Sequence, residues 1–114
     1  MMATSLFQVL LLSVLAHLAL TAIPGGWSEA DISSSQVQGA ASFAVQSRFP
    51  DLGEDPKFVV QEAFKQVVAG MKYRLLVYVY PPTSSCVQER YEVWDRFGTK
   101  TLSEAESLAD PCPQ

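Results

Sequence analysis

The chain contains no asparagine and only one histidine, His17, and both absences restrict what it can do. Without asparagine, no acceptor site for N-linked glycosylation exists. His17 lies in the apolar amino-terminal segment, so the rest of the chain cannot form a histidine-dependent nucleophilic group or a histidine-ligated metal site. The acidic residues are scattered, with no pair that stands out as an acid–base couple. We therefore expect a protein that is not an enzyme and that needs no metal or cofactor.

Positive charge is also scarce. The chain carries a formal net charge of −4, with 8 basic and 12 acidic residues and no cluster of basic residues. Binding of nucleic acid or of an anionic membrane requires such a cluster. We therefore expect neither partner for the mature protein.

Residues 1–22 are predicted to form a cleaved signal peptide. An apolar run from Leu6 to Leu20 is broken by only three polar residues, and small residues follow it. The run is shorter than the roughly 20 apolar residues of a membrane span, and no charged stop-transfer flank follows it. Cleavage after Thr21 or Ala22 would leave one small domain, residues 23–114, for a secreted, extracellular or endolysosomal location.

The two cysteines, Cys86 and Cys112, both lie in this mature domain. In an oxidising compartment an isolated pair is best explained as one disulfide. A domain of this size buries a modest fraction of its surface, so a bridge worth about 2–4 kcal/mol would matter to its stability. Two free buried thiols are the alternative.

One helix is predicted between a serine cap at residues 33–35 and Pro50, which disfavours the helical conformation of the residue before it. Residues at three- and four-residue steps give this helix one face of mainly small apolar side chains. These residues are Val37, Ala40, Ala41, Ala44, Val45 and Arg48, and Phe43 extends the stripe.

The rest of the domain has the pattern of an antiparallel sheet. A flexible lead, Ile23–Ala30, precedes the helix, and the later segments alternate between apolar and polar residues. The expected strands are Lys57–Val68, with Phe58, Val60, Phe64 and Val68 on one side, then Met71–Tyr80, with Tyr73, Leu75, Val77 and Val79 on one side, then Val87–Trp94, and a last one from Lys100 to about Ser103. Ala69-Gly70 and residues 95–99 are the expected turns. The predicted fold class is α+β, with one helix lying across a four- to five-stranded antiparallel sheet.

Four segments are informative in their order along the chain: Ile23–Ala30, Ala41–Gln46, Gln66–Gly70 and the segment from Cys86 to Cys112. Together they resemble the cystatin family of papain-class protease inhibitors. Ile23–Ala30 is similar to the amino terminus of the stefins, and Gly25 matches the family's amino-terminal glycine. Ala41–Gln46 is similar to the family's helix. Gln66–Gly70 matches the family motif Gln-x-Val-x-Gly in full. The segment from Cys86 to Cys112 resembles the carboxy-terminal half of the secreted members.

The second hairpin departs from the family pattern, which usually has Pro-Trp. Here Val93 precedes Trp94, and no proline is near. Two alignments follow. In the favoured one, Trp94 is the hairpin tryptophan in a lengthened loop. In the other, Val93-Trp94 ends the strand and Arg96-Phe97-Gly98 forms the tip, with Phe97 as the apolar contact.

The resemblance implies a reversible, tight-binding inhibitor of papain-like (C1) cysteine proteases, of the cathepsin L, B or S type or the papain type. An amino-terminal segment and two hairpin loops would form a wedge that enters the active-site cleft. The residues expected to contact the protease are Ile23, Pro24, Gly25, Gly26, Gln66, Val67, Val68, Ala69, Gly70, Trp94 and Phe97.

An alternative is a binding or scaffold module on the same cystatin-like fold that inhibits no protease, and the missing proline is the feature that favours it. We expect a monomer, with a domain-swapped dimer as the other assembly that this type of fold allows.

Overall fold

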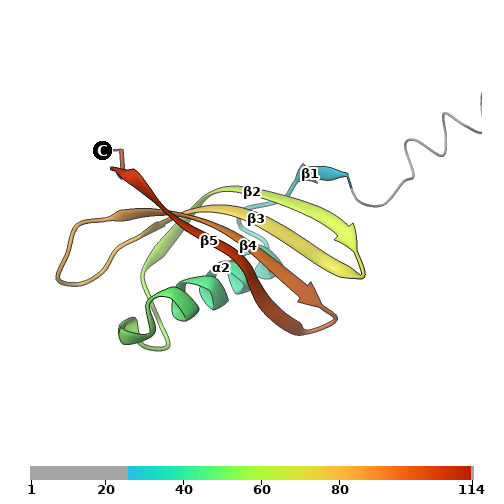
Figure 1. Cartoon of the computed structure of the whole chain (residues 1–114), viewed down its shortest axis with the longest axis horizontal. Coiled ribbons are helices and arrows are strands. Elements are labelled where there is room, and N and C mark those ends of the chain that lie inside the picture. Colours follow the sequence, from blue (N-terminus) through green and yellow to red (C-terminus); the bar gives the residue numbers. More distant parts are fainter. Residues whose placement is uncertain (1–25, 114) are drawn as a thin grey trace, which may run out of the picture.

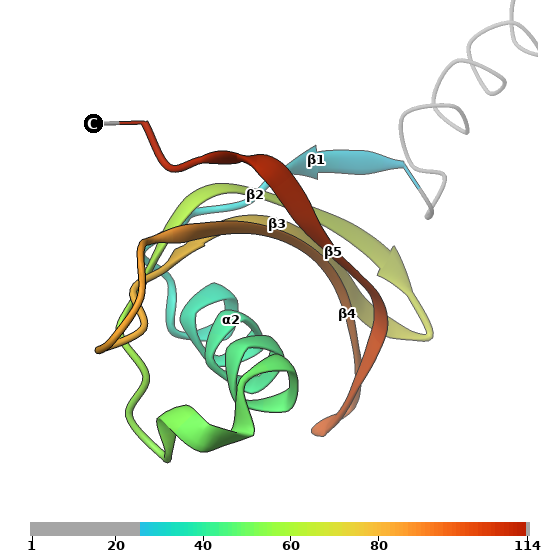
Figure 2. The ribbon, with the colours of Figure 1, turned by 60° about the vertical axis from the view of Figure 1, so that its left-hand side comes forward.

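The computed structural model describes residues 26–113, and the predicted signal segment, residues 1–22, and Ile23, Pro24 and Gly25 lie outside this range. Five antiparallel strands form one sheet in the order β1-β2-β3-β4-β5, and the sheet curves around a single long helix (Figures 1 and 2). The elements are β1 (Trp27–Glu29), α2 (Ser35–Arg48), the short 3₁₀-helix η1 (Pro50–Leu52), β2 (Phe58–Val68), β3 (Gly70–Val79), β4 (Val87–Arg96) and β5 (Thr99–Pro111). The predicted α+β class and antiparallel sheet are confirmed.

Helix α2 begins and ends as its sequence predicts. The Ser34 hydroxyl accepts a hydrogen bond from the Val37 amide at 3.2 Å, which satisfies one of the free amides at the helix start. At the other end the Phe49 amide bonds to the Val45 carbonyl at 2.8 Å, and Pro50 then starts η1. The small apolar face is buried against the sheet and consists of Val37, Ala40, Ala41, Ala44 and Val45. Side chains this small let the curved sheet approach the helix closely.

The sheet faces agree with the sequence in β3 and differ from it in β2. Tyr73, Leu75, Val77 and Val79 all point into the core, as expected. In β2 the pairing with β3 shifts between Val60 and Glu62, so Gln61 is an extra residue and the strand changes face there. Val60 and Ala63 are therefore both buried, whereas Phe64 is 38% exposed on the outer face. The expectation that Phe64 shares a side with Val60 was wrong, and the bulge explains the imperfect alternation.

Two edge strands are longer than the sequence suggested. β1 pairs with Phe64–Gln66 of β2, in a segment that was expected to be a flexible lead. β5 continues to Pro111 rather than ending near Ser103, with irregular pairing to β4 at two places. Both strands are mostly exposed and polar, so hydrogen bonds to a neighbouring strand, rather than an apolar pattern, hold them in the sheet.

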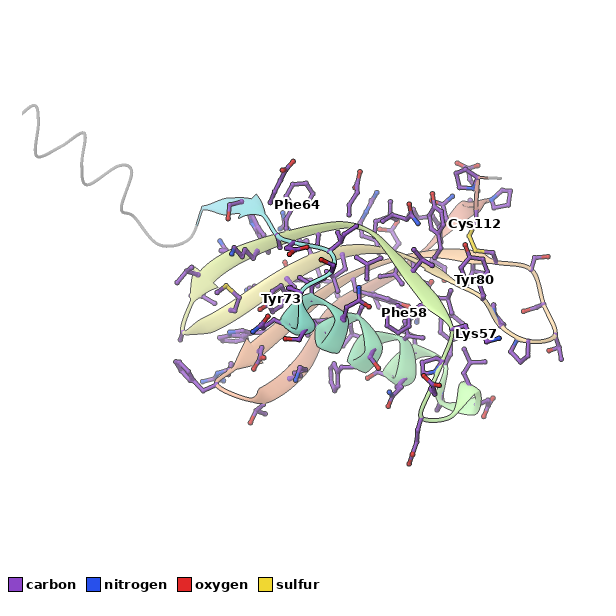
Figure 3. All side chains as sticks on the ribbon, turned by 180° about the vertical axis from the view of Figure 1, so that it is seen from behind. Lys57, Phe58, Phe64, Tyr73, Tyr80 and Cys112 are labelled. Atoms are coloured by element: carbon purple, nitrogen blue, oxygen red, sulfur yellow. A yellow bond between two sulfur atoms is a disulfide. The ribbon has the colours of Figure 1, made fainter. Side chains whose placement is uncertain are left out.

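The predicted disulfide is confirmed. Cys86 precedes β4 and Cys112 follows β5, with their Cα atoms 5.8 Å apart. The bridge lies at the end of these strands opposite to the turn that connects them (Figure 3). The disulfide therefore links the end of β5 to the start of β4, away from that turn.

A buried charged network that the sequence did not reveal connects the helix to β4 and β5. The Glu89 side chain is fully buried and accepts hydrogen bonds from Arg48 Nε at 3.0 Å, from the Tyr91 hydroxyl at 3.1 Å and from Ser107 Oγ. The hydrogen bond that Arg48 donates to Glu89 raises the pKa of Arg48, and burial together with the Glu89 charge raises the pKa of Tyr91 well above its usual range. Arg48 lies at the end of the apolar stripe of α2, and its charge is accommodated there because it pairs with this carboxylate.

Removing the Arg48 cation should show how much this network contributes to the free energy of unfolding. We expect Arg48→Met to lower the free energy of unfolding by roughly 2 kcal/mol, less than for a fully buried pair because the Arg48 side chain is 37% exposed. In a Glu89→Gln background the same change should cost much less, because no buried charge is left unpaired. Urea denaturation of the four proteins measures this coupling. Equal costs in both backgrounds would contradict it.

Candidate functional site

The β2–β3 and β4–β5 turns lie side by side at one end of the sheet (Figure 1). Met71 of β3 pairs with Asp95 of β4, and both turns lie within three residues of this pair along the chain. The amino-terminal end of β1 reaches the same end, since Trp27 pairs with Gln66. Three chain segments that are distant in the sequence therefore meet along one edge.

The first turn, Val68–Gly70, is narrow and closely packed against β4. Val68 pairs with Gly70, so Ala69 alone forms its tip, and Val67 beside it is 52% exposed. Gly70 has φ +92°, and a Cβ atom there would lie 2.2 Å from the Asp95 carbonyl oxygen. Only glycine fits both the conformation and the space. The glycine of the Gln66–Gly70 motif is thus required by the contact between the two hairpins.

The second turn consists of Phe97 and Gly98, between paired Arg96 and Thr99. Both turn residues have positive φ, +52° and +102°, as a tight two-residue hairpin requires. The Asp95 carboxylate accepts a hydrogen bond from the Gly98 amide at 2.8 Å. The Phe97 side chain is 87% exposed at the tip. Phe97 therefore lies at the tip, as the second alignment expected, but the strand continues to Arg96 instead of ending at Trp94.

Trp94 lies within β4, not in a lengthened loop as the favoured alignment expected. Its indole Nε1 donates a hydrogen bond to the Ala69 carbonyl at 2.9 Å. Lys72 Nζ and Arg96 Cζ lie 5.2 and 4.5 Å from its ring centroid, at distances typical of cation–π contacts. Trp94 thus joins the tip of the first turn to the strand that carries the second. This hydrogen bond could not be predicted from the sequence, because it depends on the register of β3 and β4.

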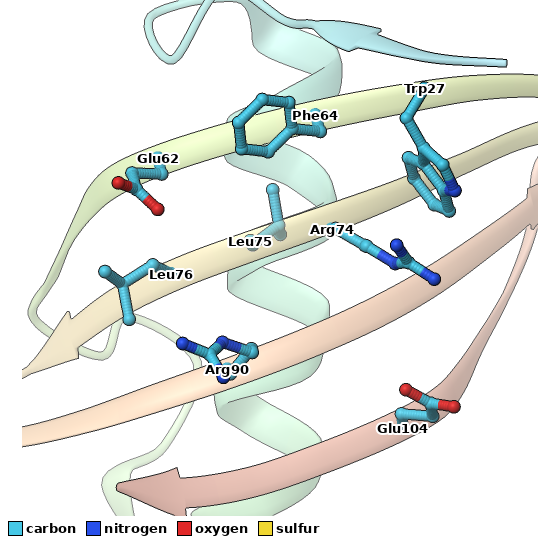
Figure 4. A pocket seen from close by; sticks show the side chains of 8 residues that line it. All are labelled: Trp27, Glu62, Phe64, Arg74, Leu75, Leu76, Arg90 and Glu104. Carbon is cyan, nitrogen blue, oxygen red and sulfur yellow. The ribbon is translucent and has the colours of Figure 1, made fainter.

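Trp27 packs on the outer face of the sheet, the face opposite α2. The Arg74 guanidinium lies 4.1 Å from the centre of its ring and bonds to Glu92 at 3.3 Å. Trp27 lines a shallow cavity of about 520 Å³ together with Phe64 and Leu76 (Figure 4). Gly26, the first described residue, is exposed beside it. Gly26, the described part of the predicted amino-terminal contact segment, thus directly precedes Trp27, which pairs with Gln66 next to the turns.

The arrangement offers a surface for binding. Across residues 26–113, no three potential metal-ligating acidic, cysteine or histidine side chains gather into one group. No helix in that range is long and apolar enough to cross a membrane. What the end of the sheet presents is an apolar valine, a narrow backbone turn and an exposed phenylalanine. These features suit insertion into a groove of another protein.

No family model matches the chain, but similar curated proteins exist. Cystatin-2 of Ornithodoros moubata is 33% identical over 84 residues, 73% of this chain and 66% of that protein. L-cystatin of Tachypleus tridentatus is 30% identical over 87 residues, 74% of this chain and 64% of that protein. Cystatin of Naja kaouthia is 42% identical over 71 residues, 60% of this chain and 50% of that protein. The chain thus spans half to two thirds of these relatives.

Solved structures show the same fold. A salivary cystatin from the soft tick Ornithodoros moubata superimposes with a TM-score of 0.62 at 22% identity, over 75% of this chain and 99% of that one. Dimeric human cystatin F superimposes with a TM-score of 0.60 at 18% identity, over 75% of this chain and 88% of that one. Sequence relatives and fold agree, and the chain belongs to the cystatin family.

Proposed function

We propose that the mature domain, residues 23–114, is a reversible, tight-binding inhibitor of papain-like cysteine proteases, of the cathepsin L, B or S type or the papain type. The observation that carries this proposal is the alignment of the two turns along one edge, in a chain of the cystatin family. The edge would enter the active-site cleft as a wedge. Membership of a family of cysteine-protease inhibitors supplies the class of target.

The geometry of the first turn supports inhibition by obstruction. Gly70 is fixed against β4 and the Ala69 carbonyl is held by Trp94, so the turn has little conformational freedom to lose on docking. Val67, Val68 and Ala69 would fill the cleft with small apolar groups. Inhibition would be non-covalent, because the turns would block the catalytic cysteine without presenting a well-aligned scissile carbonyl.

We assign different roles to the two aromatic residues of the second hairpin. Phe97 is 87% exposed at the tip and would supply the apolar contact with the protease. Trp94 is half-buried and hydrogen-bonded to Ala69, so it would mainly position the first turn. In the usual family pattern, the single segment Pro-Trp would carry both roles. Here the two roles are divided between Phe97 and Trp94.

The amino-terminal segment would complete the wedge. Ile23, Pro24 and Gly25 would bind on the unprimed side of the cleft, and exposed Gly26 would connect them to β1.

Cleavage of residues 1–22 and secretion complete the proposal, with an extracellular or endolysosomal location. The disulfide Cys86–Cys112 is consistent with an oxidising compartment. We expect the inhibitor to act as a monomer.

A binding or scaffold role without inhibition is the second candidate. The observation in its favour is the altered second hairpin, in which a Phe97-Gly98 tip takes the place of the usual Pro-Trp. Inhibition measurements distinguish the two roles.

Titration of papain and of a cathepsin-L-like protease with folded, disulfide-bonded mature protein tests the proposal. We expect stoichiometric, reversible inhibition. Val67→Asp should weaken it by roughly 30-fold or more, because it places a charge on the apolar edge. The matched control is Val59→Asp, a valine on the same strand that is 46% exposed but distant from the turns. It should leave inhibition unchanged.

Absence of inhibition at micromolar protein would eliminate the inhibitor role and favour the scaffold role. Equal effects of Val67→Asp and Val59→Asp, measured as inhibition constants with melting temperatures as a folding control, would show that the edge is assigned wrongly.

The roles of Phe97 and Trp94 can be separated by two substitutions. We expect Phe97→Ala to weaken inhibition by roughly 30-fold, with an unchanged melting temperature because the side chain is exposed. Trp94→Phe removes the indole donor and should lower the free energy of unfolding by about 1 kcal/mol. Amide chemical shifts of the first turn in the free protein should also move. Strongly weakened inhibition by Trp94→Phe without any such shift would instead make Trp94 the direct contact.

A further inference from the structure

Charge is distributed very unevenly along the sheet. We define the hairpin end as residues 27–28, 65–73 and 93–102, which comprise the two turns and the three paired rows next to them. It holds four of the eight basic residues and one of the twelve acidic residues. The hairpin end thus has a formal charge of +3, and the rest of the chain −7. The four cations are Lys65, Lys72, Arg96 and Lys100, and the anion is Asp95.

The net charge changes from positive to negative one row of residues farther from the turns. The next row away from the turns pairs Phe64 with Glu29 and with Arg74, and Glu92 with Arg74 and with Glu104. Three of its four charged residues are therefore acidic. Farther still, the segment between α2 and β2 adds Asp51, Glu54 and Asp55. The positive region is limited to the end that carries the turns.

The cations of the hairpin end are not neutralised within the protein. The two ion pairs among residues 26–113 are Arg48–Glu89 and Arg74–Glu92, and neither uses a cation of this end. Lys72 and Arg96 lie over the Trp94 ring, which leaves their charge intact. The single anion, Asp95, accepts the hydrogen bond of the Gly98 amide. A protein that meets this edge would therefore encounter a net positive charge.

We propose that the hairpin end selects papain-like proteases whose active-site cleft is bordered by acidic residues, and that it accelerates their association. This inference rests on the proposed inhibitory function. A chain with net charge −4 would repel an acidic partner on average, but the separation of charge turns the positive end toward it. Charged residues around an interface mainly affect the rate of association, whereas the apolar tips determine how slowly the complex dissociates.

The test is stopped-flow association of the protein with two papain-like proteases, one with an acidic and one with a basic cleft border. Rates are compared at about 0.01 M and about 0.15 M ionic strength, where charges act over roughly 30 Å and 8 Å. We expect association with the acidic protease to be at least about tenfold faster at low salt. The basic protease should show no such acceleration.

Charge reversal provides the matched variants. Lys65→Glu combined with Lys100→Glu should remove most of the low-salt acceleration with little change in the dissociation rate. The control, Lys57→Glu, makes the same type of change at the opposite end of β2, next to Tyr80, and should have little effect. Melting temperatures verify that all variants are folded.

The outcomes separate this inference from the proposed function. Two results would overturn the charge selection and leave the inhibitory function standing. In the first, the protein inhibits but its association rates do not depend on salt. In the second, Lys57→Glu alters the association rate as much per charge as the changes at Lys65 and Lys100 do. Faster association with the basic protease overturns it as well. No inhibition of either protease at any ionic strength contradicts the proposed function, and the inference fails with it.

Discussion

The packing of the first turn against the end of β4 is the contact on which the arrangement of the hairpin end depends. Gly70 lies so close to the Asp95 carbonyl that a Cβ atom would be 2.2 Å from it. The Trp94 indole bonds to the Ala69 carbonyl on the same edge. Together these contacts fix the two turns relative to each other before any partner is present, and a binding edge that is organised in advance loses less entropy on docking.

The rest of the domain stabilises this edge from a distance. The small apolar face of α2 packs into the concave side of the sheet, and the Arg48–Glu89 pair connects the helix to β4. The disulfide closes the far end of β4 and β5. Since these stabilising features lie away from the turns, exposed Val67 and Phe97 are available for recognition. In our proposal, the concentration of positive charge at the same end selects among partners.

Much of the fold could be predicted because local patterns determine it. The helix cap, the alternation in β3 and the cysteine pair were all confirmed. The features that were missed depend on tertiary contacts. A one-residue bulge at Gln61 reversed the faces of β2, and the polar edge strand β5 has no apolar pattern that marks its length. Buried Glu89 looks like any surface acid until its three partners are in place.

At the candidate site, the motif Gln66–Gly70 could be located from the sequence, but the second hairpin could not. Which aromatic residue occupies its tip depends on where the two-residue turn forms, and the pairing of Arg96 with Thr99 places that turn at Phe97 and Gly98, both with positive φ. Ile23, Pro24 and Gly25 lie outside the described residues, so their contacts remain predictions.

Hydrogen exchange of the mature protein in complex with papain tests the central claim most directly. The account predicts new protection of the backbone amides at residues 66–70 and 95–99, with those of helix α2 and of the strands away from the turns unchanged. Protection concentrated instead around the outer-face residues Phe64, Leu76 and Arg90, with both turns exchanging as in the free protein, would contradict it.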